Sequence, residues 1–289
     1  MFPRPRVVGP TVALAAVAAL ALTGCGPTPT ASAPTSTTTS TAAPATSAFA
    51  PSTTTTAPPT TTTTTSSPAL AGKVVVLDPG HNGGNASHPA EINALVPAGR
   101  GQEKACNTTG TATNAGYSEH AFNWDVANRV EAELQAKGVK VIMTRSSDTG
   151  VGPCVNQRAA IGNNADAAAV VSIHADGSDT PGTHGFHVEY SSPPVNAEQG
   201  APSIQLATVL RDDVRSAGFT TANYIGHDGL FGRDDLGGLN LSDRPTVLIE
   251  CGNMRNAGDA ATLTSADGRQ HIADAITAGI IAYLGGATS

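Results

Sequence analysis

The chain has 289 residues and a formal net charge of −7, because 23 Asp and Glu residues outnumber 16 Lys and Arg residues. An acidic chain without a basic cluster does not fit a nucleic-acid-binding protein, which normally presents positive charge to phosphate groups.

The first 24 residues have the pattern of an export signal. Arg4 and Arg6 precede an apolar run at 12–22 that is too short and too rich in alanine for a good transmembrane helix. The run leads into Leu22-Thr-Gly-Cys25, which resembles the lipobox of bacterial lipoproteins. That resemblance implies cleavage after residue 24, a lipid on Cys25, and anchoring to the bacterial cell membrane on the periplasmic or cell-wall side. An ordinary signal peptide that is cleaved elsewhere is the alternative.

Residues 25–70 are predicted to comprise the lipidated Cys25 and a disordered tether after it. Residues 26–70 contain no charged side chain, and 18 of these 45 residues are Thr. Such a segment cannot bury a core, and at about 3.1 Å per residue it reaches up to roughly 140 Å. It serves either to let a domain search the wall above the membrane or as a simple spacer. Residues 71–289 then form one folded domain, which we expect to act as a monomer.

Strand and helix patterns alternate through this domain. Most strand segments are near-continuous apolar runs, which is typical of a sheet covered on both faces. The alternation predicts a single α/β domain with a mostly parallel twisted sheet and helices on both faces. The expected strands are 73–77, 139–144, 168–173, 186–190 and 246–249. The expected helices are one that Ser118 caps and Gly138 ends, 156–163, 204–217, and a last one that Ser265 caps.

Two of the remaining cysteines lie in loop-like sequence. Cys106 and Cys154 are surrounded by Gly, Asn and Thr, whereas Cys251 ends an apolar strand and fits a buried free thiol. In an oxidising, exported setting we expect Cys106 and Cys154 to pair. A chain-entropy estimate gives such a bridge about 3–5 kcal/mol of stabilisation.

Three predicted strands end in residues that can bind or serve a metal. His81 follows the first strand through Asp78-Pro-Gly, and His174 and Glu250 end two later strands. Ligands gather at the carboxyl ends of strands in such sheets, and two imidazoles with a carboxylate are a common zinc set. Asp78 is a possible partner that orients His81. The alternatives are histidines hydrogen-bonded to the backbone, and a salt bridge from Glu250 to Arg244 or Arg158.

Glu119 opens the helix that follows Ser118, and Asn123 lies one turn later on the same face. A lone Glu at this position is also explained by the helix dipole. His184 and His187 are competing histidines at the start of a separate strand.

Taken together, these segments resemble the zinc-dependent N-acetylmuramoyl-L-alanine amidases of the Amidase_3 family over residues 73–284. The resemblance implies that His81, Glu119 and His174 bind one Zn²⁺ and that Glu250 is the catalytic acid and base. It also implies hydrolysis of the amide between N-acetylmuramic acid and the L-alanine of the peptidoglycan stem peptide. The matching motifs are Asp78-Pro-Gly-His81, Glu119 with Asn123, Val141-Ile-Met-Thr-Arg145 with Asp148, Arg158 with Asn163-Asn-Ala-Asp166, Ser172-Ile-His-Ala175, and Val247-Leu-Ile-Glu250 with Asn256.

Two segments depart from the family pattern. The stretch 82–118 is long and loop-like, and its His88, Glu91 or Glu103 could replace Glu119 as a ligand, or the loop could cover the groove. Cys251-Gly-Asn-Met replaces the more apolar segment that usually follows the catalytic Glu. A zinc peptidase that cuts within stem peptides and a non-catalytic peptidoglycan-binding lipoprotein are the competing functions.

Overall fold

The computed structural model describes residues 70–286 of the chain. The predicted signal peptide (1–24), the lipidation site Cys25 and nearly all of the tether therefore lie outside the described residues. Leu70, the last residue of the predicted tether, is instead buried in the core of the domain. No helix in the described part of the chain is both long and apolar enough to cross a membrane.

A six-stranded sheet forms the centre of the domain, in the order β4-β1-β5-β8-β6-β7. The strands β4, β1, β5 and β8 are parallel, β6 runs antiparallel to β8, and β7 is parallel to β6. A separate antiparallel hairpin pairs β2 with β3. The strands are β1 (Val74–Pro79), β2 (Leu95–Pro97), β3 (Glu103–Ala105), β4 (Lys140–Met143), β5 (Ala169–Asp176), β6 (His187–Ser191), β7 (Leu230–Arg233) and β8 (Thr246–Asn253).

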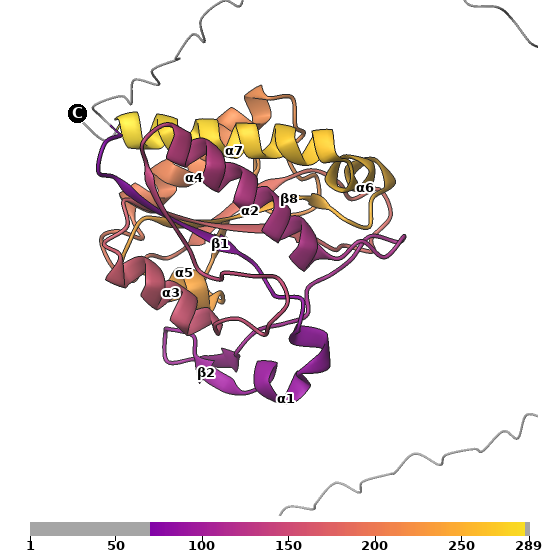
Figure 1. Cartoon of the computed structure of the whole chain (residues 1–289), viewed down its shortest axis with the longest axis horizontal. Coiled ribbons are helices and arrows are strands. Elements are labelled where there is room, and N and C mark those ends of the chain that lie inside the picture. Colours follow the sequence, from indigo (N-terminus) through magenta and orange to yellow (C-terminus); the bar gives the residue numbers. More distant parts are fainter. Residues whose placement is uncertain (1–69, 287–289) are drawn as a thin grey trace, which may run out of the picture. The chain divides into compact units, whose positions relative to one another are not determined.

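Helices cover both faces of this sheet, as the sequence predicts (Figure 1). One face carries α2, α4 and α7, and the opposite face carries α3 and α5, beyond which lie the β2–β3 hairpin and α1. The helices are η1 (Asn85–Ser87), α1 (Pro89–Ile92), α2 (Glu119–Ala136), α3 (Val155–Asn164), α4 (Ala201–Ser216), α5 (Gly237–Asn240), α6 (Ala257–Thr264) and α7 (Ala266–Gly286).

The main core lies between the sheet and the layer of long helices. The residues that form this core follow from two periodicities. Alternate residues of a strand face the same side of the sheet, and helix residues three or four positions apart lie on the same face of the helix. Thus Val75 and Leu77 of β1 belong to this core, whereas Val76 belongs to a small second cluster on the α3 face. The fully buried apolar residues contributed by α2 are Phe122, Val126, Ala127, Val130 and Leu134.

The helix starts were predicted correctly at α2 and α7. Ser118 is the N-cap residue of α2, although its side chain makes no capping hydrogen bond. The Ser265 hydroxyl, by contrast, accepts a hydrogen bond from the backbone amide of Gly268 in the first turn of α7. The helix α2 packs on β1 and β5, and α7 packs against α2 and α4. The start of α2 lies where β1 and β5 end.

Candidate metal centre

His81, Glu119 and His174 meet at the carboxyl end of the parallel strands. Each offers one ligand atom, and the three atoms lie within 4.8 Å of one another. His81 follows β1, Glu119 is the first residue of α2, and His174 lies near the end of β5. Within residues 70–286, this is the one group of three or more His, Cys, Asp or Glu side chains that could hold a metal ion. The structure therefore brings together the three residues predicted from the sequence, and their role as ligands remains a prediction.

The turn between β1 and His81 depends on Gly80. A Cβ atom built on Gly80 would lie 2.1 Å from the imidazole of His174, so only glycine fits between the two strand ends. The amide of Gly80 still donates to the carbonyl of Ile173 at 3.0 Å, which continues the β1–β5 ladder. His81 itself has a φ of 58°, which is uncommon for a residue with a side chain. This geometry turns the His81 imidazole toward His174, and their ring centroids are 4.9 Å apart.

The backbone of Thr108 sets the orientation of His81. The Thr108 carbonyl lies 3.1 Å from Nδ1 of His81, and a carbonyl can only accept a hydrogen bond, so Nδ1 carries the proton. The Nε2 lone pair of a neutral His81 then points at Oε1 of Glu119, 3.1 Å away. Asp78 does not perform this orienting role, contrary to the sequence-based prediction. Its carboxylate instead accepts hydrogen bonds from Thr144, Arg158 and Ser172.

Glu119 is buried, and both of its carboxylate oxygens have hydrogen-bond partners. Oε1 lies 2.9 Å from Nδ1 of His174, and it accepts a 3.3 Å hydrogen bond from the amide of Ala175. Oε2 accepts from the amide of Thr111 at 2.9 Å. Burial opposes ionisation of Glu119, but the charge of His81 and hydrogen bonds from both histidines outweigh it and hold its pKa well below the ordinary value. Glu119 is therefore a carboxylate aimed at two imidazoles, which a helix-dipole role alone does not explain.

Glu250 lies beside this group but outside the set of converging ligand atoms. In the sheet it pairs with His174 of β5 on one side and His187 of β6 on the other. Its carboxylate lines the same cavity of about 410 Å³ as the three candidate ligands, and its Oε2 is buried without a hydrogen-bond partner. Burial, followed by the negative charges of Glu119 and Glu189, raises the pKa of Glu250 well above its usual value.

Glu250 makes neither of the salt bridges considered as its alternative role, and the competing candidate ligands have other contacts or are exposed. Arg158 pairs with Asp78, and Arg244 pairs with Asp166, so neither arginine neutralises Glu250. His88 is occupied by the carbonyl of Gly84 and the hydroxyl of Ser87. His187 lies 3.4 Å from Glu189, His184 contacts the carbonyl of Gly182, and Glu103 is an exposed residue of β3.

Glu189 and Arg233 are cavity residues that the sequence analysis missed. Both line the cavity that contains Glu250, and Arg233 donates a 2.7 Å hydrogen bond to the buried carboxylate of Glu189. A Glu within the apolar segment 186–190 was the available signal, because a charge in a buried strand needs a partner. Arg233 could not be paired with it from the sequence, since the neighbouring strand β7 was not predicted.

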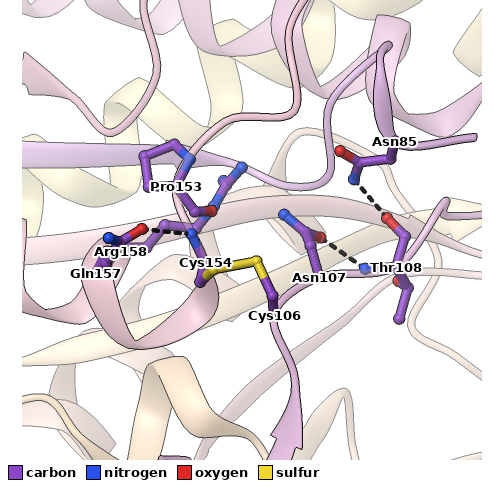
Figure 2. Close-up of a disulfide and its surroundings, with 8 residues drawn as sticks. All are labelled: Asn85, Cys106, Asn107, Thr108, Pro153, Cys154, Gln157 and Arg158. Atoms are coloured by element: carbon purple, nitrogen blue, oxygen red, sulfur yellow. Dashed lines mark hydrogen bonds between the residues drawn. A yellow bond between two sulfur atoms is a disulfide. The ribbon is translucent and has the colours of Figure 1, made fainter. Parts of the chain in front are cut away.

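A disulfide joins Cys106 to Cys154, as predicted, and Cys251 is a buried free thiol. Figure 2 shows the bridge beside the segment 107–108 and the start of the helix that carries Arg158. Cys106 is followed by Asn107 and Thr108, and Cys154 is the N-cap residue of the helix that carries Arg158. The Thr108 carbonyl also accepts a 2.7 Å hydrogen bond from Asn85 (Figure 2). Arg158 donates to the carbonyl of His81 at 2.9 Å. The disulfide thus connects the segment of Thr108 to the helix of Arg158, and both of these residues hydrogen-bond to His81.

The fold and this group of residues place the chain in a known class of cell-wall enzymes. A family model described as N-acetylmuramoyl-L-alanine amidase, Amidase_3, matches residues 75–282. Because the match covers most of the chain, the protein belongs to this family.

Three mycobacterial proteins with this activity in their names share about half of their aligned residues with this chain. The N-acetylmuramoyl-L-alanine amidase Rv3717 of Mycobacterium tuberculosis is 49% identical over 215 residues, which are 74% of this chain and 88% of that protein. The crystal structure of the amidase Ami1 from Mycobacterium smegmatis is 52% identical, with a TM-score of 0.73 over 75% of this chain and 99% of that one. Ami1 from Mycobacterium abscessus, in its apo form, is 53% identical, with a TM-score of 0.72 over 74% and 100% of the two chains.

Proposed function

We propose that this protein is a zinc-dependent hydrolase that cleaves the amide between N-acetylmuramic acid and the L-alanine of peptidoglycan. Family membership and the relatives' names support the reaction. The observation that carries the proposal is the arrangement of a buried carboxylate between two imidazoles, with a second, unpartnered carboxylate on the adjacent strand.

The donor set fits zinc on physical grounds. With its proton on Nδ1, His81 directs a lone pair at an oxygen of Glu119 that is itself an acceptor. Two acceptors 3.1 Å apart repel one another unless a cation or a proton lies between them. Three protein ligands of the His₂Glu type also leave a position open for water or substrate, as catalytic zinc sites require. His81, Glu119 and His174 would therefore hold the ion.

The reaction then needs one group that moves protons, and Glu250 fits this requirement. Bound zinc supplies Lewis-acid activation of the water and of the substrate carbonyl. Glu250 accepts the proton of the water that attacks the amide carbonyl. It returns this proton to the nitrogen of L-alanine as the carbon–nitrogen bond breaks. Its raised pKa suits both steps, because a carboxylate with an ordinary pKa is a weak base at neutral pH and rarely holds the proton that it must return.

The test is to incubate the purified protein with defined muropeptides and identify the products by mass spectrometry, with and without a chelator. We expect a free stem peptide that begins at L-alanine and a peptide-free sugar, both lost with the chelator and restored by zinc. Shortened stem peptides would instead identify a peptidase. Absence of any product from the zinc-loaded protein would favour a binding role.

We also propose that the protein is exported, anchored through a lipid on Cys25, and active as a monomer. The lipobox-like sequence Leu22-Thr-Gly-Cys25 supports the anchor, and the cell-wall substrate of the relatives supports export. Cys25→Ala should release the protein from the membrane fraction of cells. An unchanged membrane fraction would argue against lipidation.

A further inference from the structure

A second cavity, of about 230 Å³, adjoins the candidate metal centre and has no role in the mechanism above. Its walls are the loop after β5 (178–183), the loop after β8 (253–257) and Asn114. Gly177 and Thr111 line the metal-site cavity, whereas Ser178 and Asn114 line this one, so the same two segments border both cavities. The second cavity therefore lies along the chain segments that lead away from the metal centre.

Asn253 fixes the walls of the second cavity. Its side-chain oxygen accepts hydrogen bonds from the amides of Ser178 and Arg255, both at 3.0 Å. Its side-chain nitrogen donates to the carbonyls of Ser178 and Thr183 at 2.9 and 3.1 Å. Because Asn253 is 1% exposed and all these bonds are internal, the cavity is preformed. This asparagine belongs to the Cys251-Gly-Asn-Met segment that departs from the usual family sequence.

Arg255 is the cation of this cavity, and its guanidinium lacks a good acceptor. The nine other arginines within residues 70–286 each make a hydrogen bond of 2.9 Å or shorter. The shortest side-chain bond of Arg255 is 3.3 Å, to Oδ1 of Asn114, and its Nε is buried without a hydrogen-bond partner. Oδ1 of Asp179 forms an ion pair with this same Nε at 3.5 Å, and the Asp179 side chain is 84% exposed. Such an exposed pair contributes little, so a ligand can displace Asp179 at small cost.

We propose that Arg255 binds a carboxylate of the peptidoglycan stem peptide in this cavity while the peptide's first amide lies at the metal centre. This inference rests on the proposed amidase function. A planar guanidinium pairs with a carboxylate through two parallel hydrogen bonds, and Nε is one of the donors that such a pair uses. Asn114 contributes a second polar group at the same wall.

The distance from the metal centre suits a stem peptide. Ser178 follows His174 by four residues, and Arg255 follows Glu250 by five, so at about 3.3 Å per residue the cavity lies no more than about 17 Å away. An extended peptide covers that distance in about five residues. A carboxylate on one of the first few stem residues can therefore reach Arg255. The subsite would select peptides whose carboxylate is free over those in which it is amidated.

Steady-state kinetics of the full chain test this selection, with two muramoyl peptides that differ only in whether the carboxylates after L-alanine are free or amidated. We expect Arg255→Gln to raise KM for the free-acid peptide about tenfold and to leave kcat unchanged. The amidated peptide should show little difference between the wild type and Arg255→Gln. Arg255→Lys should restore part of the loss, because it keeps the charge but not the paired donors.

Two further variants separate charge recognition from a structural effect. Asp179→Asn removes the competing carboxylate and should lower KM for the free-acid peptide. Arg215→Gln removes an exposed arginine of α4 and should change neither constant. Equal KM changes for both peptides in Arg255→Gln, or no change for either, would overturn the proposal.

Binding measurements test the preference for the free-acid peptide without relying on turnover. The two peptides are titrated by calorimetry into the full chain that carries Glu250→Gln, with and without Arg255→Gln. A preference for the free acid that disappears with Arg255→Gln supports the subsite even if the wild type fails to cleave the muramoyl amide. Equal affinities for both peptides would remove the subsite while leaving a measured amidase activity intact.

Discussion

The guanidinium of Arg158 donates a 2.9 Å hydrogen bond to the carbonyl oxygen of His81. The same side chain, which is 4% exposed, also donates to the carboxylate of Asp78 at 2.7 Å and to the carbonyl of Pro79 at 2.8 Å. One residue of α3 therefore holds the whole turn that points His81 toward the other candidate ligands. The charge on Asp78 keeps that arginine in place.

The Asp78–Arg158 pair predicts a specific loss of stability in acid. Burial alone would raise the pKa of Asp78, but Arg158 and the hydrogen bonds from Thr144 and Ser172 lower it from 3.8 to about 2. Because the folded-state pKa is depressed, the stabilisation is present above pH 4 and is lost as the pH falls through about 2. The shift corresponds to about 2 kcal/mol at neutral pH.

Denaturant unfolding of the wild type and Asp78→Asn between pH 2 and pH 7 measures this contribution. The variant should be at least about 2 kcal/mol less stable at pH 7, and the difference should shrink steadily below pH 4. Asp234→Asn, which changes an exposed carboxylate, serves as the control. A deficit of the same size at pH 2.5 and at pH 7 would show that the charge of Asp78 is not its cause.

Glu119 should determine zinc retention. Glu119→Ala removes one of three proposed ligands, and we expect zinc affinity to fall at least about a hundredfold, because loss of supporting groups alone can cost that much. Glu103→Ala changes an exposed residue of β3 and should retain zinc like the wild type. Metal content after competition with a chelator, together with circular dichroism to check folding, measures both. Equal zinc content in the two variants would contradict the ligand assignment.

The fold class and the residues of the candidate site were predictable because both depend on local patterns. Apolar runs define the buried strands, and the polar residues that end them must meet at one edge of a parallel sheet. The strand β7 was not predicted, since Leu230–Arg233 is short and contains a glycine. The β2–β3 hairpin was also missed, because three-residue strands without a buried residue carry no clear alternation.

The partner of Asp78 shows why contacts across the sheet could not be predicted. Proximity in sequence favoured His81, three residues away. The register of β1 against β5 instead places Asp78 opposite Ser172, and β4 delivers Thr144 from the other side. Register depends on the packing of the whole sheet, and a single sequence gives no direct information about it.

Glu250 should be required for turnover but not for zinc. Glu250→Gln keeps the size of the side chain and removes its ability to exchange a proton, so we expect kcat to fall by about 10²–10⁴-fold. Zinc content should stay at the wild-type level, because Glu250 is outside the group of converging ligand atoms. Product formation measured by mass spectrometry and metal analysis of the same samples test both statements. Full activity in this variant would refute the proposed mechanism.

The disulfide should contribute to zinc binding as well as to stability. The bridge closes a loop with a sequence separation of 48 residues. For a loop of this size, the chain-entropy model gives about 4 kcal/mol of stabilisation. The cysteines also precede Thr108 and the helix of Arg158, which hold the side chain and the backbone of His81, respectively. Loosening both supports should weaken zinc affinity even under conditions in which the domain remains folded.

The Cys106→Ser, Cys154→Ser double variant tests the two effects separately. We expect its free energy of unfolding to fall by up to about 4 kcal/mol and its zinc affinity to fall by about tenfold or more. A reductant should lower the unfolding free energy and the zinc affinity of the wild type toward those of the double variant. It should leave the double variant unchanged, so the double variant controls for other effects of the reductant. If stability fell while zinc affinity in the folded state stayed constant, the bridge would act on the unfolded chain alone. In that case, Thr108 and Arg158 would hold His81 without help from the disulfide.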